Sequence, residues 1–555
     1  MSFAPTAEQQ AAVDGFLTGK NLTIAAGAGT GKTSTLRYIA DAAGDRQGLY
    51  IAFNKSVQEE AARKFQGTAV RPRTAHSLAY ASMPDELRHK LQQKSRMPQR
   101  DQQEALGLRL DIRVGEERVR KHVVMRLVRE TLEKFCRTAA ESIDASMVPP
   151  LLTLNEVQNA ELAQTVFRYA QKYWYDVLNP DGALPFKHDY YLKLWQLSQP
   201  TLPYDFILLD EAQDSDPLLV DVLHRQVNTQ LVAVGDRSQA IYGWRGATDS
   251  MDAFGGETFQ LTQSFRFGHA IAEEANVWLD LLDADLRIRG SEKDSSVHAS
   301  YVRVANGVLC RTNAGAIAEV IDAHQRTDRD GSKITVGIAS EARAKQMREL
   351  ANAAMQLQER GYTSHPELDA FDSWEAVQEY ATEDDGADLA PLVRLVDDYG
   401  ADKIVAAIDA CVPAVEARST ISTVHVAKGL EWKHVRIAED FPIPGVDDSG
   451  ELEQMTPEAM MLAYVAVTRA QRHLDPAGLD WARGYRQALR RPEHAATWAQ
   501  NAQKHRYIEM QRRKDSVSDP DAVGRMKGVK SSGGGWNRGG NAGGSRGSWS
   551  GRRAS

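Results

Sequence analysis

The fold of this chain is decided by the stretch Ala26-Gly27-Ala28-Gly29-Thr30-Gly31-Lys32-Thr33. It follows the apolar run 22–24 and precedes an amphipathic stretch from residue 34, so it lies where a buried strand passes into a helix. Glycines let successive backbone N–H groups turn toward phosphate oxygens, and the helix N-terminus adds its positive dipole end. The alternative is a glycine-rich turn that only links a strand to a helix. The Gly-Lys-Thr ending favours a nucleoside triphosphate site, in which Lys32 reaches the β- and γ-phosphates and the Thr33 hydroxyl binds Mg²⁺.

An acidic pair follows a second apolar run. Residues 206–209 are Phe-Ile-Leu-Leu, and Asp210 and Glu211 come directly after them. In the hydrolytic interpretation Asp210 holds Mg²⁺, directly or through water, and Glu211 orients and deprotonates the attacking water. An acidic cluster after a strand can also be a favourable helix N-terminus. Its combination with the phosphate loop favours hydrolysis.

Length and composition limit the class of protein. The chain has 555 residues, more than the ~250–300 that one core usually holds, so several domains are expected. Its 42% hydrophobic and 26% charged residues are typical of a globular protein in water. No apolar run approaches the ~18 residues of a membrane helix, and no signal segment opens the chain. The three cysteines are too far apart for a CxxC metal framework. We therefore expect a cytoplasmic protein without a membrane partner.

Short apolar runs separated by helical stretches predict an α/β fold with parallel sheets. The runs are 22–24, 48–53, 206–209, 231–234 and 435–438. Residues 82–200 and 340–418 have instead the pattern of charged amphipathic helices, which predicts two mainly helical insertions. The expected division is a first α/β domain at 1–81 and 201–257, a second at 258–339 and 419–480, and a helical extension at 481–523.

The last stretch, 524–555, has a different composition. It consists mainly of Gly, Ser and Arg, with seven Lys or Arg residues, no acid, and two isolated tryptophans, Trp536 and Trp549. Such a composition cannot bury a core, so we expect a disordered tail. The tail is either a solubilising linker or a weak strand-binding segment, because Arg and Trp both stack on unpaired bases.

Taken in order, these motifs resemble the UvrD/Rep-like superfamily 1 DNA helicases over residues 5–475. The resemblance rests on the phosphate loop with Ala26 in place of its first glycine, on Asp-Glu-Ala-Gln-Asp at 210–214, and on segment 234–247. It implies two RecA-like P-loop domains with ATP between them. It further implies that Gln9 reads the adenine edge and that Gln239 senses the γ-phosphate. The DNA contacts implied for the first half are Phe53, Asn54, His76, Tyr242, Trp244 and Arg245.

The second half contains segments that resemble the later motifs of this family, at 263–266, 423–432 and 464–470. They imply Phe265 as adenine stacker, Arg266 as a phosphate contact and Arg469 as arginine finger, a role that suits a group able to hold two phosphate oxygens at once. The implied catalytic set is Lys32, Thr33, Asp210, Glu211, Gln239, Arg266 and Arg469. The implied nucleotide contacts are Gln9, Ala26, Gly27, Ala28, Gly29, Thr30, Gly31, Lys32, Thr33, Phe265 and Glu431, with Thr33 and Asp210 on the metal and His425 on DNA.

One segment points to a branch of the family. Residues 187–195 and the small second insertion resemble the F-box DNA helicase group and its bacterial or phage relatives, although no extra N-terminal domain precedes the first motif and we expect no F-box. The resemblance implies ATP and Mg²⁺ as cofactors and 3′→5′ movement. It also implies single-stranded DNA and tailed DNA as partners, with strand-binding or recombinase proteins as further candidates. No acidic and lysine cluster follows the last motif, so we expect no DNA cleavage.

Three functions remain open at this point. The chain is either a helicase that unwinds DNA, a translocase that strips recombinase or other proteins with little unwinding, or a nucleotide-gated scaffold whose slow hydrolysis times a complex. An acidic balance of −8 argues against nonspecific wrapping of DNA and favours a local groove. The presence of Glu211, Gln239 and both arginines favours a motor over a timer, because a timer needs none of them.

Overall fold

The computed structural model describes residues 4–92, 97–242, 251, 253–298, 304–327, 331–365, 367–369, 371–382, 389–447, 451–491 and 495–518. Contacts divide the chain into a large unit that ends at Ala502 and a second unit from Gln503. The tail expected at 524–555 lies outside the described residues. Within the described ranges, no helix is both long and apolar enough to span a bilayer.

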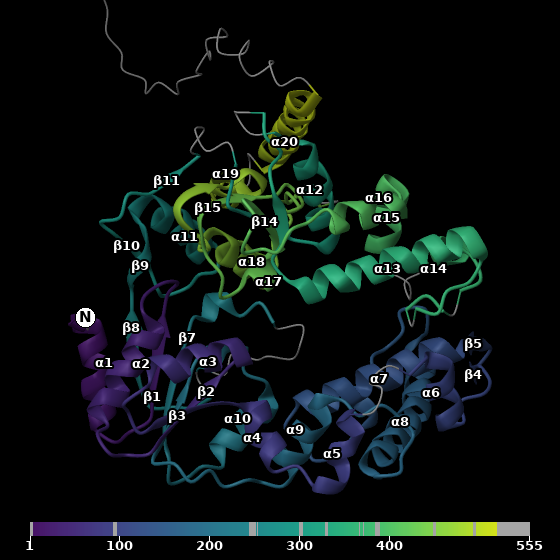
Figure 1. Ribbon diagram of the computed structural model, residues 1–555, viewed down its shortest axis with the longest axis horizontal. Helices are drawn as coiled ribbons and strands as arrows, with labels where there is room; N and C mark the ends of the chain where they lie inside the picture. Colours follow the sequence, from purple (N-terminus) through teal and green to yellow (C-terminus); the bar gives the residue numbers. More distant parts are fainter. Residues whose placement is uncertain are drawn as a thin grey trace, which may run out of the picture. The chain divides into compact units, whose positions relative to one another are not determined.

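The first sheet has six parallel strands, and the first four predicted apolar runs all form strands in it (Figure 1). Its order is β3 (Val70–Thr74), β2 (Gly48–Ala52), β6 (Phe206–Leu209), β7 (Gln230–Gly235), β1 (Leu22–Ala26) and β8 (Glu257–Leu261). Both faces of β6 are buried: Phe206 and Leu208 pack into one core, and Ile207 and Leu209 into another. Burial on both faces explains why the run is continuously apolar rather than alternating.

Helices cover the first sheet and form the first insertion. The helices of the sheet domain are α1 (Ala7–Leu17), α2 (Lys32–Ala42), α3 (Lys55–Lys64), α4 (Ala75–Ala81) and α10 (Pro217–His224). The insertion contains α5 (Asp85–Gln92), α6 (Gln99–Leu106), α7 (Lys121–Arg137), α8 (Glu156–Leu178) and α9 (His188–Leu197), with a small antiparallel hairpin of β4 (Ile112–Val114) and β5 (Glu117–Val119). The core of these helices is continuous with one face of the sheet, so the insertion is anchored to the strand that carries Asp210.

The second sheet also has six parallel strands. Its order is β11 (Ser296–Val297), β16 (Ala470–Asp475), β15 (Trp432–Ile437), β12 (Gly307–Cys310), β14 (Ser419–Thr423) and β13 (Val336–Ile338). The accompanying helices are α11 (His269–Leu281), α12 (Asn313–Gln325), α17 (Val424–Ala427), α18 (Pro457–Val467) and α19 (Ala482–Leu489), and the second insertion contributes α13 (Glu341–Arg360), α14 (Trp374–Thr382), α15 (Ala390–Tyr399) and α16 (Ala401–Asp409). A last helix, α20, spans Ala495–Ser518. Two parallel α/β sheets with helical insertions confirm the predicted fold class.

The strand around Phe259 corrects one expectation. We place the start of the second domain at residue 258, yet β8 pairs in parallel with β1 and completes the first sheet. An apolar run indicates that a strand is present, but it does not say which strand it pairs with. The chain leaves the first sheet only at Thr262 and continues into β9 (Gln263–Gly268), which pairs with β10 (Arg289–Ser291).

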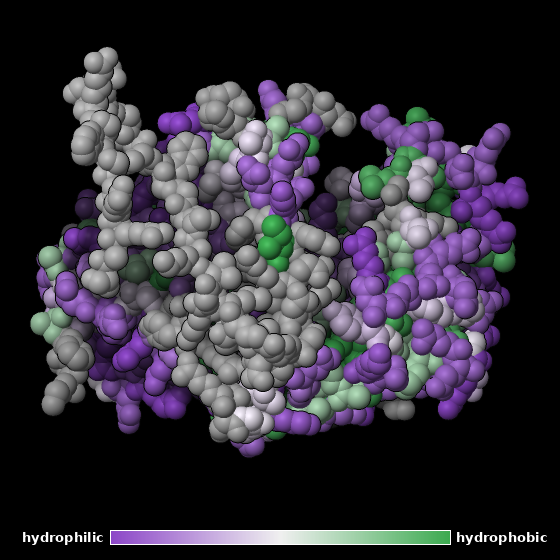
Figure 2. Space-filling view, turned by 90° about the horizontal axis from the view of Figure 1, so that it is seen from above, coloured by the Kyte–Doolittle hydropathy of each residue, from purple (hydrophilic) through white to green (hydrophobic). Residues whose placement is uncertain are grey.

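The surface seen in Figure 2 is mainly hydrophilic where the placed residues are visible, with small separate hydrophobic areas. The largest exposed apolar side chains are spread over several elements, among them Leu110, Leu152, Val227 and Val415. Scattered apolar side chains of this kind are ordinary on a globular protein.

The turn after β6 holds a strained backbone. Glu211 has φ 52° and ψ 44°, the left-handed conformation that residues other than glycine rarely adopt. The Glu211 carboxylate meets Lys32, the first residue of α2. Backbone strain of this kind collects at functional sites, where surrounding contacts hold it in place.

This strain predicts an inverted order of stability for two substitutions. At most positions glycine is less stable than alanine by about 0.5–1 kcal/mol, but at φ 52° alanine bears a steric penalty of roughly 1–2 kcal/mol that glycine avoids. We therefore expect Glu211→Gly to melt at a higher temperature than Glu211→Ala in thermal denaturation. The same pair at Glu60, inside helix α3, should show the ordinary order. Equal melting temperatures for the two Glu211 variants would contradict the assigned backbone conformation.

Candidate functional site

The loop between β1 and α2 has the backbone that phosphate binding requires. Gly29 and Gly31 have φ 72° and 84°, and Gly31 is the N-cap of α2. A Cβ atom added to Gly29 would lie 2.5 Å from the Cβ of Arg266, so this position excludes a side chain. The Thr30 hydroxyl donates to the Gly27 carbonyl at 2.9 Å and closes the loop. Ala26, Gly27 and Ala28 are buried beneath it.

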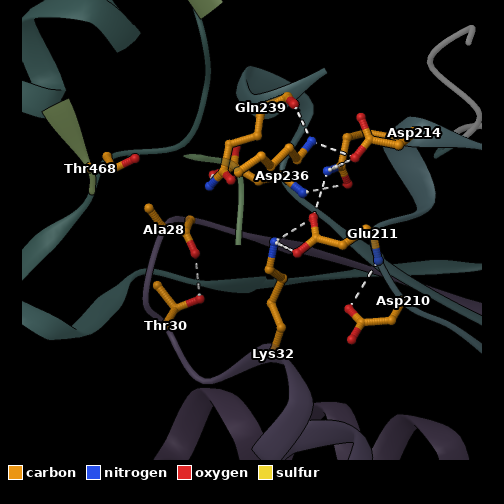
Figure 3. A network of polar contacts seen from close by, with 12 residues as sticks. Ala28, Thr30, Lys32, Asp210, Glu211, Asp214, Asp236, Gln239 and Thr468 are labelled. Carbon is orange, nitrogen blue, oxygen red and sulfur yellow. Dashed lines mark hydrogen bonds and ion pairs between the residues drawn. The ribbon is translucent and has the colours of Figure 1, made fainter. Parts of the chain in front are cut away.

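Lys32 and Glu211 meet at the centre of the site (Figure 3). The Lys32 Nζ lies 3.0 Å from both carboxylate oxygens of Glu211. Asp210 accepts a hydrogen bond from the Tyr50 hydroxyl at 2.5 Å and another from the Glu211 backbone N–H at 3.0 Å. Thr33, the second residue of α2, is half-buried. The fold therefore brings the predicted phosphate lysine next to the predicted general base, and the predicted metal ligand Asp210 lies beside that base.

Burial and charge act in opposite directions on these groups. Burial lowers the pKa of Lys32, but the charges of Glu211, Asp236 and Asp210 outweigh it and raise that pKa. Burial would raise the pKa of Glu211, yet Lys32 and Lys428 bring it down to about 2. Burial together with the charge of Glu211 raises the pKa of Asp210. The negative charge of the two adjacent carboxylates is only partly compensated by Lys32. Further positive charge near Asp210 would therefore stabilise the pair.

A second hub connects the two sheets. Asp236, after β7, accepts hydrogen bonds from the Gln239 amide and from the Tyr464 hydroxyl, both at 2.8 Å. Tyr464 belongs to α18 of the second sheet domain, and its oxygen also accepts the backbone N–H of Ala28 at 3.3 Å. The Arg469 Nη2 donates to Gln239 Oε1 at 3.3 Å. The predicted γ-phosphate sensor and the predicted arginine finger are thus direct neighbours.

Arg266 lies on the opposite wall with a partner of its own. Its Nε donates to Glu431 at 2.5 Å, and its Nη1 donates to the Thr468 carbonyl at 3.0 Å. Glu431 also accepts from Gln471 at 2.6 Å. Burial and the positive charge of the neighbouring Arg266 lower the pKa of Arg469. Both guanidinium groups line the same cleft. Such a pair suits a ligand with several negative charges.

Gln9 and Phe265 approach the same position beside Gly31 of the loop, and this position is called the slot below. A Cβ placed on Gly31 would lie 3.0 Å from Gln9 Nε2 and 3.6 Å from the Phe265 ring. Gln9 is buried, with its Oε1 accepting from the Thr6 backbone at 3.0 Å, whereas 45% of Phe265 is exposed. An amide edge and an open aromatic face at one point are the contacts a purine requires.

A cleft of about 780 Å³ connects the phosphate loop, Lys32 and Glu211 with Arg266 and Arg469. Its lining includes Gly29, Lys32, Glu211, Gln239, Arg266 and Arg469. Drug-sized ligands occupy clefts of roughly 300–1,000 Å³, so the volume accommodates a nucleoside triphosphate. Mg²⁺ prefers hard oxygen ligands and keeps several positions for phosphate and water. The Thr33 hydroxyl and the Asp210 carboxylate provide such oxygens, and the charge imbalance at Asp210 and Glu211 fits a divalent cation.

An aromatic cluster continues from this cleft. Phe53 and Tyr242 stack with ring centroids 5.7 Å apart and planes 16° from parallel. The Tyr242 hydroxyl donates to the His425 carbonyl at 3.0 Å. The cleft is also lined by Asn54, whose side chain caps helix α3 by accepting the Val57 N–H at 3.0 Å. Four of the predicted DNA contacts, drawn from three separate segments, therefore lie together.

His76 lies in an adjoining cleft of about 690 Å³ that shares Phe53 and Asn54 as lining residues. Its Nε2 is 3.8 Å from Asp189 of α9, and its ring packs edge-on against Tyr191 at 5.9 Å. The segment that resembles the F-box group thus supplies the neighbours of a predicted DNA contact. The other two predicted contacts, Trp244 and Arg245, lie outside the described residues.

Sequence reasoning missed four residues that hold the site together: Tyr50, Asp236, Lys428 and Tyr464. Lys428 donates to Asp214 and, at 2.5 Å, to the Gln239 carbonyl, and its Nζ lies 5.3 Å from the centre of the Tyr242 ring. Tyr50 and Tyr464 could have been found as polar side chains inside otherwise apolar runs. Lys428 gave a weaker signal, because its partner is far away in sequence.

Comparisons with known proteins agree with this geometry. The UvrD/REP helicase N-terminal domain matches residues 5–252, and the UvrD-like helicase C-terminal domain matches residues 339–475. F-box DNA helicase protein 1 of Schizosaccharomyces pombe is 27% identical over 84% of this chain and 57% of its own length. F-box DNA helicase 1 of Gallus gallus is 31% identical over 82% of this chain and 47% of its own. The chain spans about half the length of these curated relatives.

Among solved structures, a complex of arterivirus nonstructural protein 10 (helicase) with DNA is 11% identical, with a TM-score of 0.28 over 86% of this chain and 64% of that one. That likeness is too slight to add to the argument. The two domain matches lie in the expected order and together span more than half of the chain, and they include the phosphate loop, the acidic pair and Arg469. On these grounds the chain belongs to the UvrD/Rep family of superfamily 1 helicases.

Proposed function

We propose that this protein is an ATP-driven motor that moves 3′→5′ along single-stranded DNA and unwinds tailed duplexes during replication, repair or recombination. One observation carries the proposal. Lys32 contacts Glu211, which accepts a hydrogen bond from the Gln213 amide. That amide also donates to Asp214 at 3.3 Å. Lys428 donates to Asp214 and faces the ring of Tyr242 in the aromatic cluster, so the path of contacts is continuous. A path that joins a hydrolytic centre to base-sized aromatic surfaces is what a coupled motor requires.

The hydrolytic step depends on an exchange of partners at Lys32. While Lys32 pairs with Glu211, the carboxylate has a pKa of about 2 and is a weak base. When the Lys32 ammonium turns to the phosphates, Glu211 loses its main counter-charge, and its pKa rises toward the range of a useful general base. Asp210 and Thr33 would hold Mg²⁺, which would neutralise part of the phosphate charge when bound. Glu211 then takes the proton of the attacking water.

Two arginines, Arg266 and Arg469, make the domains respond to the nucleotide. They bind the γ-phosphate from the second domain, and Lys32 binds it from the first. Hydrolysis removes the group that both sides hold, so the cleft opens and closes once per cycle. Gln239, bonded to Arg469 and close to Lys428, transmits that change toward the strand.

Strand movement relies on aromatic stacking. Stacking a base on an aromatic side chain contributes roughly 1–3 kcal/mol, and one DNA stacking step is worth ~1.4 kcal/mol on average. The two energies are similar, so no single bound position is a deep free-energy minimum. Phe53, Tyr242 and Trp244 can therefore release one base and bind the next. His76 and His425 add polar contacts along the same path.

The names of the relatives support DNA as the substrate, since both are called DNA helicases. The domain boundaries expected from the sequence, apart from the strand β8, form part of this proposal. A translocase that displaces recombinase or strand-binding proteins is the second candidate. It differs from a helicase in failing to separate strands although ATP hydrolysis responds to DNA.

Two substitutions separate the sensing of the nucleotide from the binding of the strand. Arg469→Ala removes a cation from the nucleotide wall, so ATP hydrolysis should fall by about 10³-fold or more while strand binding persists. Phe53→Leu removes a ring but no phosphate contact, so basal hydrolysis should persist while unwinding of a 3′-tailed duplex falls. Tyr175→Leu replaces an exposed ring on α8 and serves as the control. Steady-state ATPase and strand-displacement assays on 3′- and 5′-tailed duplexes measure these outcomes.

Loss of basal hydrolysis in Phe53→Leu, together with normal hydrolysis in Arg469→Ala, would reverse the assigned roles. Unwinding of only the 5′-tailed duplex would contradict the direction of movement. Hydrolysis that responds to DNA without unwinding of either duplex would favour the translocase.

A further prediction concerns the pH dependence of DNA-stimulated ATP hydrolysis. Burial raises the pKa of Asp214 to about 6, while Lys428 acts in the opposite direction. Asp214 is therefore ionised above about pH 6, and its ion pair with Lys428 is lost as the pH falls through that value. We expect the ratio of DNA-stimulated to basal ATPase to decline from pH 7.5 to pH 5.5. Asp214→Asn should have a low ratio that changes little over this range. A decline of the same size in Asp214→Asn would assign the titration to another group.

A further inference from the structure

Glu8 makes an unusual set of contacts for a residue in the first turn of a helix. Its carboxylate accepts the Thr262 backbone N–H at 2.8 Å and the Thr262 hydroxyl at 2.6 Å. Arg289 of β10 donates to the same carboxylate at 2.7 Å and also to the Thr262 hydroxyl, at 3.1 Å. Glu8 thus binds α1 to the point where the chain leaves β8 and enters β9.

The segment that Glu8 holds carries two groups of the nucleotide site, Phe265 and Arg266. Its main chain is fixed at two further points. The Phe265 N–H donates to the Gly29 carbonyl at 2.8 Å, and its carbonyl accepts from Lys293 at 2.6 Å. The Ser264 hydroxyl donates to the Ala28 carbonyl at 3.0 Å. The backbone is immobilised while the Phe265 ring stays open, as expected of a platform for a ligand.

Glu8 precedes Gln9 directly, so one turn of α1 holds both sides of the slot. Gln9 reaches into the slot from α1, and Phe265 faces it from the segment tied to Glu8. A Cβ atom placed on Gly31 would lie 3.0 Å from Gln9 Nε2 and 3.6 Å from the Phe265 ring, so both side chains approach the same position. A planar base is accepted only if the amide edge and the ring keep this separation, because the affinity of an aromatic platform depends on close contact.

We propose that Glu8, through Thr262 and Arg289, is a positioning residue that sets the separation of Gln9 and Phe265 and thereby the affinity for an adenine nucleotide. This inference rests on the proposed function, since it takes the slot to be the nucleoside site. Glu8 touches neither base nor phosphate in this arrangement and acts only through the segment it holds.

The charge state of Glu8 agrees with the geometry. Partial burial would raise the pKa of its carboxyl, but the hydrogen bonds from Thr262 and the charge of Arg289 outweigh it and lower that pKa. The group is therefore an anion at neutral pH and can accept from several donors at once.

A purely structural role for Glu8 is the main alternative. An acid in the first turn of a helix stabilises that helix through its dipole, and Glu8 occupies that place in α1. A substitution would then lower the melting temperature without changing nucleotide affinity. The test must therefore measure binding and stability separately.

The experiment uses the full chain and compares Glu8→Gln, Thr262→Val and Arg289→Met with the wild type. Glu133→Gln is the matched control, because Glu133 is another partly exposed acid paired with a cation, Lys187, at 2.9 Å, and it lies in the first insertion. Each variant is titrated with a fluorescent ADP analogue, assayed for the KM and kcat of ATP hydrolysis with saturating single-stranded DNA, and melted thermally.

For Glu8→Gln we expect the KM for ATP and the dissociation constant for the ADP analogue to rise about tenfold, the equivalent of one lost charge-assisted hydrogen bond, with kcat within about twofold. Thr262→Val should give a smaller rise. The double variant Glu8→Gln with Arg289→Met should be no worse than Glu8→Gln alone, because both changes break the same linkage. Glu133→Gln should leave both constants unchanged.

Unchanged nucleotide affinity in Glu8→Gln, whether or not its melting temperature falls, would overturn the inference. Wild-type protein that binds the ADP analogue but shows no DNA-stimulated hydrolysis would overturn the proposed motor function, while the affinities would still decide the role of Glu8. A wild type without affinity for the analogue would overturn both.

Discussion

The site depends on four acids that lie together at one edge of the first sheet. Asp210, Asp214 and Asp236 are buried and Glu211 is partly buried, and buried charge without compensation costs several kcal/mol per ion. Lys32 comes from the first sheet domain, but Lys428 reaches Asp214 from the second. The acids therefore do more than bind a metal and a water. They require cations from the second sheet domain. That requirement is a physical reason for the two sheet domains to work as one unit.

Polar contacts across a cleft are suited to change, whereas apolar packing is not. The links described here join single side chains, such as Tyr464 to Asp236 and Arg469 to Gln239. Each can be replaced by a phosphate oxygen or a water at small net cost, because the net value of one such bond is only about 0.5–1.5 kcal/mol. A core shared between the sheets would resist this exchange. The cores around the two sheets form separate clusters for most of their volume, which leaves the polar contacts as the adjustable part.

Much of the architecture could be predicted from the sequence because local patterns of residues encode it. The phosphate loop, the acidic pair after β6 and the five apolar runs each carry their own signal. The strand β3 was missed because Val-Arg-Pro-Arg-Thr is polar and contains a proline, which is tolerated since β3 is an edge strand. The assignment of β8 and the partners of Lys428 and Glu8 could not be predicted for a different reason. They depend on which distant segments meet, and no local pattern encodes that choice.

For the same reason, no sequence motif identifies the role of Glu8. Beside Gln9 it looks like an acid that favours a helix start, and only the fold brings Thr262 and Arg289 to it. Glu8 binds both Thr262, where the chain leaves β8, and Arg289 of β10, so these two segments keep their places relative to α1. The Phe265 N–H then fixes the same crossing to the Gly29 carbonyl of the phosphate loop. The position of the Phe265 ring is therefore set by residues that lie far apart in the sequence, which is why no local pattern reveals it.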